Sequence, residues 1–358
     1  MNGYSEEEKY WIWLASLGLG AKATYQALRC CGSAKSFFDA VKNGSAVLEG
    51  LPVDTLRPAE AACSYQRVAE IISELASKNI YALTRLNAGY PARLASIPWP
   101  PPVLFVMGCL TDLDRAIGIV GTRRCTRRGF EFTRRMAADL GGMPVVSGLA
   151  RGIDTAAHLG ALDASAPTVA VLGCGADVIY PPENAELFHR IGQNGAVISE
   201  LPLGTQPYLG HFPVRNRIIA GLSRGLLVVE SEMKGGTAIT TSLAIKYGCD
   251  MFAVPGPPYM SMGELPNALI AAGAVPVASA ADVKKYYGEG VPLAEGEEAK
   301  PVMDLTQAKI YELLRREDLS AEGLAALSGL EPGDLSMALT MMELSGIIRR
   351  LQGGKYGV

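Results

Sequence analysis

Apolar residues at the start of the chain recur at the spacing of a helix. Within 10–17 and again within 68–75, apolar side chains fall three or four positions apart, which places them on one helical face. No convincing strand pattern interrupts this texture between residues 4 and 83. The pattern therefore predicts an N-terminal helical domain over residues 1–85.

One turn in this helical region has a possible function. Residues 17–20, Leu-Gly-Leu-Gly, stand between two helical stretches and resemble the turn of a helix-hairpin-helix module, whose amides can meet a DNA phosphate. An ordinary turn between helices explains the residues equally well, because Lys22 is the single basic residue beside them. The domain is therefore expected to be like a SAM or helix-hairpin-helix module, with its role left open.

From residue 116 the pattern changes to short apolar runs alternating with helical stretches. A strap at 91–102 precedes it, with five prolines in twelve residues, which a regular helix or central strand would exclude. Runs that are apolar throughout are typical of strands buried on both faces of a parallel sheet. The alternation predicts an α/β domain over 86–287, with a doubly wound, Rossmann-like parallel sheet. The expected strands are 117–120, 145–147, 169–172, 197–199, 226–229 and 252–254, and the expected helices are 129–140, 154–162, 184–191, 215–222, 238–247 and 265–272.

The last part of the chain has a third pattern of polar and apolar residues. Residues 288–302 are polar, Gly-rich and acidic, and are predicted to be a linker. Beyond it, 303–358 shows three helical stretches and then two short strand patterns around Gln352-Gly353-Gly354, a hairpin signal. Three helices followed by a hairpin predict a C-terminal winged-helix domain.

Charge and composition limit the possible partners. The chain has 33 basic and 36 acidic residues, so a protein that coats nucleic acid or membranes by bulk charge is disfavoured and any anion site must be local. Its seven cysteines form no C-x-x-C pair, which is typical of a reduced cytoplasmic protein. The start lacks the features of a signal peptide and no apolar run is long enough to span a bilayer, so we expect no membrane association.

Glycines, hydroxyls and arginines follow the predicted strands. Ligands of an open parallel sheet bind beyond the carboxyl ends of its strands, and these residue types suit an anion there. Glycine lets the backbone approach closely, helix N-terminal amides attract negative charge, and the arginine fork fits phosphate. We therefore predict a site for a phosphate-bearing ligand. The candidate residues are Gly121, Thr122, Arg123, Arg124, Ser147, Gly148, Arg151, Gly173, Asn184, Arg215, Arg217, Gly236 and Thr237.

Nucleotide cofactors are disfavoured by the motifs. The chain has no Walker A loop, because 234–237 reads Lys-Gly-Gly-Thr, with the residues in the wrong order. The stretch 173–178 lacks the third glycine of the dinucleotide fingerprint. NTP hydrolysis and NAD or FAD binding are therefore not expected, and no cofactor is predicted.

Catalytic and metal-binding constellations are also sparse. The three histidines, His158, His189 and His211, are too scattered for a metal cluster. Asp154 lies one helical turn before His158, but a helix cap and a hydrogen-bonded histidine explain the two better than zinc does. No G-x-S-x-G elbow occurs. The site is expected to bind a ligand, with no catalytic residue and no metal.

Taken in order, the motifs resemble those of the DNA-processing protein A (DprA/Smf) family. The longest, VSGLARGIDTAAH at 146–158, matches the longest family signature, and the collinear matches cover about residues 90–274. The other matching motifs are Gly121-Thr122-Arg123, Leu172-Gly173-Cys174-Gly175, Tyr180-Pro181 with Asn184, Ser199-Glu200, the segment 212–223 and Val254-Pro255-Gly256.

The resemblance implies a protein that binds single-stranded DNA and loads the RecA recombinase on it, as in natural transformation. It implies a homodimer formed through the Rossmann-like domain, here with the helix 265–272, and no known catalysis. In the implied DNA pocket Arg123 pairs with a backbone phosphate, and Arg215 and Arg217 are further candidates for phosphate contact. The residues implied to shape or line the pocket are Gly121, Ser147, Gly148, Arg151 and Asn184.

The chain departs from the family pattern at two places. Many relatives have Lys or Arg where this chain has Pro182, so one phosphate contact is either missing or supplied by Arg124 or Arg127. After the strand 226–229, residues 235–241 differ from the usual family sequence but keep its turn chemistry.

Two other classes of protein share part of this pattern. Nucleotide phosphoribohydrolases of the lysine-decarboxylase-like type share this Rossmann variant, but the Gly235-Gly236 turn lacks their following catalytic Glu; release of adenine from AMP would favour this class. A transcription factor that reads duplex DNA with its winged helix is disfavoured, because the predicted recognition helix 334–345 has no Lys or Arg. Arg349, Arg350 and Lys355 of the hairpin are the suitable cations there, so packing or protein interaction fits this domain better.

Overall fold

The computed structural model describes residues 3–288, 305–344, 347–351 and 354–357. The chain divides into two compact units, Met1–Glu289 and Gly290–Val358. The predicted linker 288–302 lies outside the described residues except for its first position, and so do Gln352 and Gly353 of the predicted hairpin turn. The domain boundaries proposed from the sequence remain predictions.

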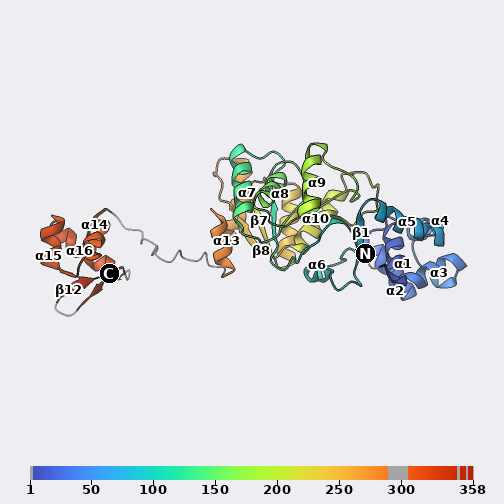
Figure 1. The fold of residues 1–358 in the computed structure, drawn as a ribbon, viewed down its shortest axis with the longest axis horizontal. Helices are drawn as coiled ribbons and strands as arrows, with labels where there is room; N and C mark the ends of the chain where they lie inside the picture. The colour runs from blue at the N-terminus through green and yellow to red at the C-terminus, as the bar shows by residue number, and fades with distance from the viewer. Residues whose placement is uncertain (1–2, 289–304, 345–346, 352–353, 358) are drawn as a thin grey trace. The chain divides into compact units, whose positions relative to one another are not determined.

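Five helices and one 3-10 turn form the N-terminal region, blue in Figure 1. The first helix begins with a capping box, in which the Glu8 amide donates to Ser5 Oγ (3.3 Å) and the Ser5 amide donates to Glu8 Oε2 (2.7 Å). The helices enclose the fully buried side chains of Trp13, Phe37 and Phe38. The elements are α1 (Glu6–Ala15), α2 (Ala21–Cys31), α3 (Ala34–Asn43), η1 (Ala46–Leu48), α4 (Val53–Ala61) and α5 (Tyr65–Ser77).

Two strands that the sequence pattern did not reveal join this region to the sheet. β1 (Ile80–Thr84) pairs antiparallel with β2 (Val103–Gly108), and Val103 and Phe105 share the core of the N-terminal helices. The expectation of no strand before residue 83 was therefore wrong, because β1 is short and follows a helix directly. The strap was also expected to exclude a helix, yet α6 (Ala92–Ser96) begins just after Pro91, where the proline precedes the first turn.

The central sheet has nine strands in the order β1-β2-β6-β5-β4-β3-β7-β8-β9. The six strands from β3 to β8 confirm the expected ones to within two residues, and the neighbouring pairs from β6 to β9 are parallel. β2 runs antiparallel to β6, so the sheet is mixed at this edge. The remaining strands are β3 (Ile117–Val120), β4 (Val145–Ser147), β5 (Thr168–Val171), β6 (Ala196–Ser199), β7 (Gly225–Val228), β8 (Asp250–Ala253) and β9 (Val275–Pro276).

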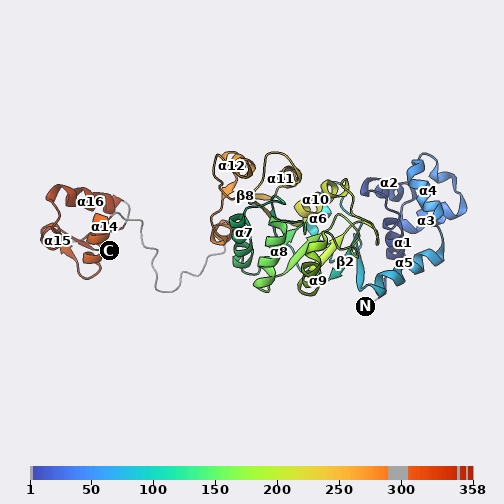
Figure 2. The same cartoon turned by 90° about the horizontal axis from the view of Figure 1, so that it is seen from above.

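Helices cover both faces of this sheet, as Figure 2 shows. α7, α8 and α9 pack against one another on one face, while α6, α10 and α11 pack together on the other. The strand order reverses between β3 and β7, which makes their carboxyl ends the switch point where such sheets bind ligands. The doubly wound α/β fold expected from the sequence is confirmed. The helices after α6 are α7 (Arg127–Asp139), α8 (Ile153–Asp163), η2 (Pro182–Asn184), α9 (Ala185–Asn194), α10 (His211–Leu222), α11 (Gly236–Lys246), η3 (Ser261–Gly263), α12 (Glu264–Ala271) and α13 (Ala280–Tyr286).

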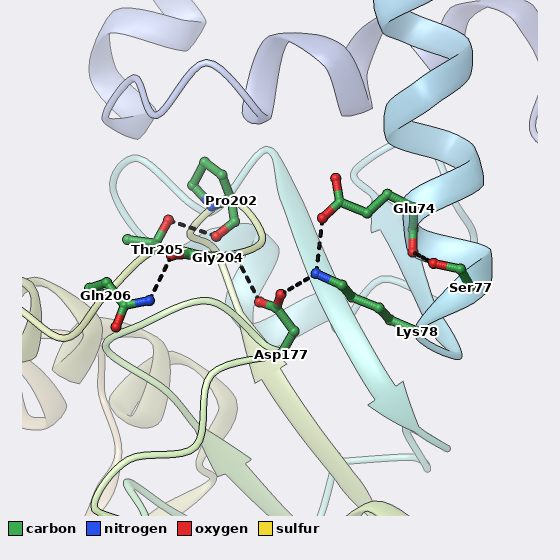
Figure 3. Close-up of polar contacts among 8 residues, drawn as sticks. All are labelled: Glu74, Ser77, Lys78, Asp177, Pro202, Gly204, Thr205 and Gln206. Carbon is green, nitrogen blue, oxygen red and sulfur yellow. Dashed lines mark hydrogen bonds and ion pairs between the residues drawn. The ribbon is translucent and has the colours of Figure 1, made fainter.

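A polar contact ties the N-terminal helices to a loop of the sheet (Figure 3). Lys78, which follows α5, donates to Glu74 Oε1 (2.9 Å) and to Asp177 Oδ2 (2.6 Å). The other oxygen of Asp177 accepts from the amide of Gly204 (2.8 Å). Burial alone would raise the pKa of Asp177, but the hydrogen bonds from Lys78 and Gly204 lower it. The loop after β6 is therefore anchored to the N-terminal region at Gly204.

The second unit is a winged-helix domain. Its helices enclose a small core that includes Ile310, Leu324, Leu339 and Met342. The sheet has three short strands in the order β10-β12-β11, one more than the sequence pattern predicted. Among the described residues of the whole chain, no helix combines the length and apolar character needed to cross a membrane. The elements of this unit are α14 (Leu305–Leu314), β10 (Leu319–Ser320), α15 (Ala321–Ser328), α16 (Pro332–Leu344), β11 (Arg349–Arg350) and β12 (Lys355–Gly357).

Candidate nucleic-acid interface

A cavity of about 530 Å³ opens at the switch point of the sheet, and we call it the main cavity. It lies beyond the carboxyl ends of β3 and β7, and the first turns of α10 and α11 complete its wall. Seven of the predicted residues line it, namely Gly121, Thr122, Arg123, Arg124, Arg215, Gly236 and Thr237.

A much smaller hollow adjoins the main cavity. The two share Arg123, Ala150, Phe212 and Arg215, and the hollow adds the predicted residues Gly148, Arg151 and Gly173. Ser147, Asn184 and Arg217 are the predicted residues that line neither. The structure thus brings most of the residues predicted from the sequence together in one region, although their contacts differ.

Two arginines after β3 present charge to solvent. Arg123 and Arg124 are exposed, and neither forms an ion pair with any described residue. The Arg123 guanidinium carbon lies 5.3 Å from the centre of the Phe212 ring. The backbone of this turn is fixed, since the Thr122 amide donates to Glu230 O (2.7 Å) and the Arg124 amide donates to Thr122 Oγ1 (3.2 Å). The two cations are therefore held at the cavity and remain available to an anion.

Arg215 is buried and serves the protein itself. Its side chain donates to the carbonyl oxygens of Gly148 (2.8 Å) and Val171, and to Asn216 Oδ1 (3.2 Å). A Cβ added to Gly148 would lie 2.6 Å from Arg215 Nη2, so only glycine fits there. Burial lowers the pKa of Arg215 to about 10. These contacts hold the ends of β4 and β5, and the phosphate contact expected of Arg215 from the sequence stays a prediction.

Asp154 and His158 are buried close to Arg215. Burial raises the pKa of Asp154 to about 6, although the positive charge of Arg215 opposes this shift. Asp154 does not cap α8, because Gly152 holds the N-cap position; instead its Oδ2 accepts from the Ala150 amide at 3.4 Å. The sequence-based expectation that Asp154 caps α8 was therefore wrong, and Asp154 instead stabilises the turn before the helix.

His158 is a neutral core residue. Its Nδ1 lies 2.7 Å from Thr168 Oγ1, and that hydroxyl donates to Val145 O at 3.0 Å, so Nδ1 carries the proton. Burial and the charge of Arg215 lower the pKa of His158 to about 3. Within the residues that the structure describes, no group of three or more His, Cys, Asp or Glu side chains is arranged to hold a metal ion.

Buried polar groups shape the turn between β4 and α8. Ser147 Oγ donates to Ile119 O (2.6 Å), and Asn184 Nδ2 donates to Leu149 O (3.0 Å) and Thr155 Oγ1 (2.9 Å). Leu149 has a φ of +55°, which a residue with a side chain rarely adopts, so the Asn184 contact holds a strained position. Ser147 and Asn184 therefore shape the site from within the fold.

Two predicted arginines have carboxylate partners. Arg151 is exposed and pairs with Glu183, with Nε 3.1 Å from Oε1. Arg217 is nearly buried and pairs with Glu200, whose own pKa is raised by burial. Pro182 stands exposed just before Glu183. Arg127 pairs with Glu131 at 2.8 Å, whereas Arg124 has no ion pair among the described residues; which of the two supplies a phosphate contact stays a prediction.

The start of α11 supplies backbone amides to the main cavity. Its N-cap is Gly235, with a φ of +127° and no side-chain cap, so the first amides of the helix keep their donors. Gly236 and Thr237 line the cavity together with exposed Lys234. A helix N-terminus of this kind favours a negatively charged group.

Many lining residues of the cavity were not among the sequence candidates, and Lys234 and Leu209 are two of them. Lys234 is an exposed cation without an ion pair among the described residues, and its place before a glycine pair was a usable signal. Leu209 lines the cavity and is 79% exposed, and Tyr208 beside it is 65% exposed. No periodic pattern marks these two, because they lie in the loop between β6 and α10.

The fold and the site define a Rossmann-like α/β protein with a cavity lined in part by cations at its switch point and an appended winged helix. Residues 81–288 match the family model of DNA recombination-mediator protein A, and residues 294–354 match that of the DprA winged helix domain. The chain therefore belongs to the DprA/Smf family, as the sequence motifs indicated.

Individual relatives agree with this assignment. Protein Smf of Synechocystis is 35% identical over 327 residues, which cover 80% of this chain and 82% of that protein. The crystal structure of DprA from Streptococcus pneumoniae aligns with a TM-score of 0.64 at 33% identity, covering 76% of this chain and 95% of that one. DprA from Helicobacter pylori, described for its single-stranded DNA binding mode, aligns with a TM-score of 0.53 at 28% identity, covering 59% and 96%.

Proposed function

We propose that the main cavity binds single-stranded DNA. The observation that carries this proposal is the set of exposed cations at its rim: Arg123, Arg124 and Lys234 have no ion pair among the described residues. Together with the first amides of α11 they offer donors to successive phosphates of one strand. The single-stranded DNA binding mode described for the H. pylori relative supports the same ligand.

Exposed aromatic and apolar side chains beside these cations explain a preference for single strands. Leu209 and Phe212 line the cavity, and Tyr208, the residue before Leu209, is exposed. Bases can stack on such surfaces when they are not already stacked inside a duplex, and stacking has little sequence preference. We therefore infer a binding mode in which the cations hold the backbone while the apolar side chains meet the bases.

A direct test compares single-stranded and duplex oligonucleotides of the same sequence by fluorescence anisotropy. We expect the single strand to bind at least about ten times more tightly, because a base stacked on the protein contributes about 1–3 kcal/mol. The affinity should fall as salt rises, with a slope of about −0.7 per neutralised phosphate in log–log form. Equal affinity for both DNA forms, or binding that salt does not weaken, would contradict the proposal.

We further propose that the protein loads RecA on the bound strand and acts as a homodimer of its α/β domain. Family membership supports both. Leu265 and Leu269 of α12 are buried in their own domain, but Ile245 on α11 and Tyr259 in the loop before α12 are 56% and 87% exposed. Exposed apolar side chains on these elements are candidates for contact with a second copy.

The loading proposal predicts that the protein speeds the assembly of RecA on single-stranded DNA. Assembly can be followed by the DNA-dependent ATPase activity of RecA on DNA coated with single-strand-binding protein. We expect a shorter lag with the wild-type chain, and no shortening with Ile245→Asp if the dimer is required. An unchanged lag with wild-type protein would exclude the loading role.

We also infer that the site binds its ligand without catalysing a reaction and without a cofactor. The buried Asp154, His158 and Arg215 are occupied with internal contacts, and the cations at the rim are suited to holding phosphate. We also propose a cytoplasmic location, which the seven cysteines support because all of them are free.

A further inference from the structure

A separate groove lies on the N-terminal region, outside the main cavity and the small hollow beside it. It has a volume of about 590 Å³ and is formed by α1, α2 and the strap before β2. We call it the Trp99 groove. Its side chains combine aromatic rings with arginines, and they include Trp11, Tyr25, Arg29, Arg85 and Trp99.

Trp99 is held in place at the surface. Its side chain is 39% exposed and its φ is +54°, a left-handed conformation that is unusual for a residue with a side chain. The Tyr25 ring lies 6.3 Å from the Trp99 ring, and the Trp11 ring lies 6.5 Å from Tyr25. The structure thus maintains a row of three aromatic rings along one open groove.

Two arginines accompany these rings. The Arg29 guanidinium carbon lies 5.6 Å from the centre of the Trp99 ring, and Arg85 Nη1 lies 3.5 Å from the Tyr25 hydroxyl. Both side chains are exposed and form no ion pair with any residue that the structure describes. Aromatic faces beside unpaired guanidinium groups are what proteins use to hold single strands without sequence preference.

α10 links the groove to the main cavity. Phe212 and Pro213 in its first turn line the main cavity, while Arg217, one turn further, lies close enough to Tyr25 to influence its ionisation. Burial raises the pKa of Tyr25, and the charges of Arg85 and Arg217 oppose that shift. Ile97, two residues before Trp99, packs on α10, because a Cβ added to Gly221 would lie 3.0 Å from Ile97 Cγ2. α10 therefore contacts the segment that carries Trp99 and also lines the main cavity.

We propose that the Trp99 groove is a second binding site for single-stranded DNA, which stacks bases of the strand where it leaves the main cavity. This inference rests on the proposed function of the main cavity. A short oligonucleotide would occupy the main cavity alone, whereas a longer strand would reach Trp99 and pair a phosphate with Arg29.

Tryptophan fluorescence can report directly on this site. The chain has three tryptophans; Trp11 and Trp99 line the groove and Trp13 is fully buried. Stacking of a base quenches an indole, so we expect oligo(dT) of about 30 nucleotides to quench the emission, and one of about 6 nucleotides to bind without quenching. Trp99→Phe should retain binding of the long strand and lose most of the quenching.

Affinity measurements complete the test. Trp99→Ala and Arg29→Ala should each weaken binding of the long oligonucleotide about tenfold and leave the short one unchanged. Tyr65→Ala is a matched control, because Tyr65 is 55% exposed and has Lys42 Nζ 3.6 Å from its ring, yet lies outside the groove. Circular dichroism melting should show that each variant is folded.

The outcomes separate this proposal from the proposed function. If the groove variants bind the long strand as tightly as wild type while Arg123→Glu loses binding, the groove is not a DNA site and the main cavity still is. If the groove variants keep full DNA affinity but lose RecA, the groove binds a protein and the proposal is wrong. If the wild-type chain binds neither oligonucleotide, both proposals fail.

Discussion

Arg123→Glu lowers the affinity for single-stranded DNA by about 10- to 100-fold, the loss expected for one charge-assisted hydrogen bond of about 1.5–3 kcal/mol. Arg123 is exposed, sits on the Phe212 ring and has no ion pair among the described residues, so its charge is directed to the ligand. Reversing the charge also places a carboxylate where a phosphate would lie. Fluorescence anisotropy with a labelled oligonucleotide measures the change.

Arg135→Glu is the control for this experiment. Arg135 lies near the other end of α7, pairs with Asp139 and is 86% exposed, so the substitution makes the same change in net charge away from the cavity. We expect it to alter the affinity by less than about threefold at physiological salt, because such distant charges are screened. Equal losses in the two variants would show that bulk charge acts, and would refute the assignment of Arg123 to the site.

Arg215→Met destabilises the protein by about 2–6 kcal/mol, because two buried carbonyl acceptors lose their donor at about 1–3 kcal/mol each. The variant leaves Asp154 buried without a nearby positive charge, and it leaves the carbonyl oxygens of Gly148 and Val171 without their donor. Methionine fills most of the space, so lost packing adds little. The shift of the urea midpoint, followed by circular dichroism on the full chain, measures the effect.

The cost of Arg215→Met depends on pH in a defined direction. In the wild type the pKa of Asp154 is raised to about 6, and losing Arg215 removes the charge that opposes this rise. A carboxyl with a raised pKa in the folded state loses stability as pH increases from its unfolded value through its folded one. The variant should therefore be more destabilised at pH 8 than at pH 5, and Asp154→Asn added to it should remove that difference. A loss that is the same at both pH values would contradict this account of the pair.

The central strands could be predicted because burial on both faces leaves a direct trace in the sequence. β3, β5, β6 and β7 are buried at every position, and each appears as a short apolar run, apart from Thr168 at the start of β5 and Ser199 at the end of β6. β1 lies at the edge and alternates between buried and half-buried positions over five residues, which is too short to stand out after a helix. Its pairing with β2 is decided by tertiary contacts that no local pattern records.

The candidate site could also be predicted only in part. The rule that ligands lie beyond the carboxyl ends of parallel strands placed most candidates in one region. It could not tell which arginines face solvent: Arg123 is exposed, whereas Arg215 and Arg217 point inward to carbonyl and carboxylate oxygens. Whether an arginine faces solvent depends on how α10 packs against the ends of the strands. The sequence shows an arginine in both cases and does not record that packing.

β1 has a consequence for any shortened form of this protein. A chain that began at residue 86 would lose the partner of β2, and the backbone amides and carbonyls of Val103–Gly108 would become an open edge. Val103 and Phe105 would also lose the helices that cover them. Exposed apolar edges of this kind recruit strands from other molecules. Loss of DNA binding in such a truncated protein would therefore report aggregation, and it would say nothing about whether the N-terminal helices touch DNA.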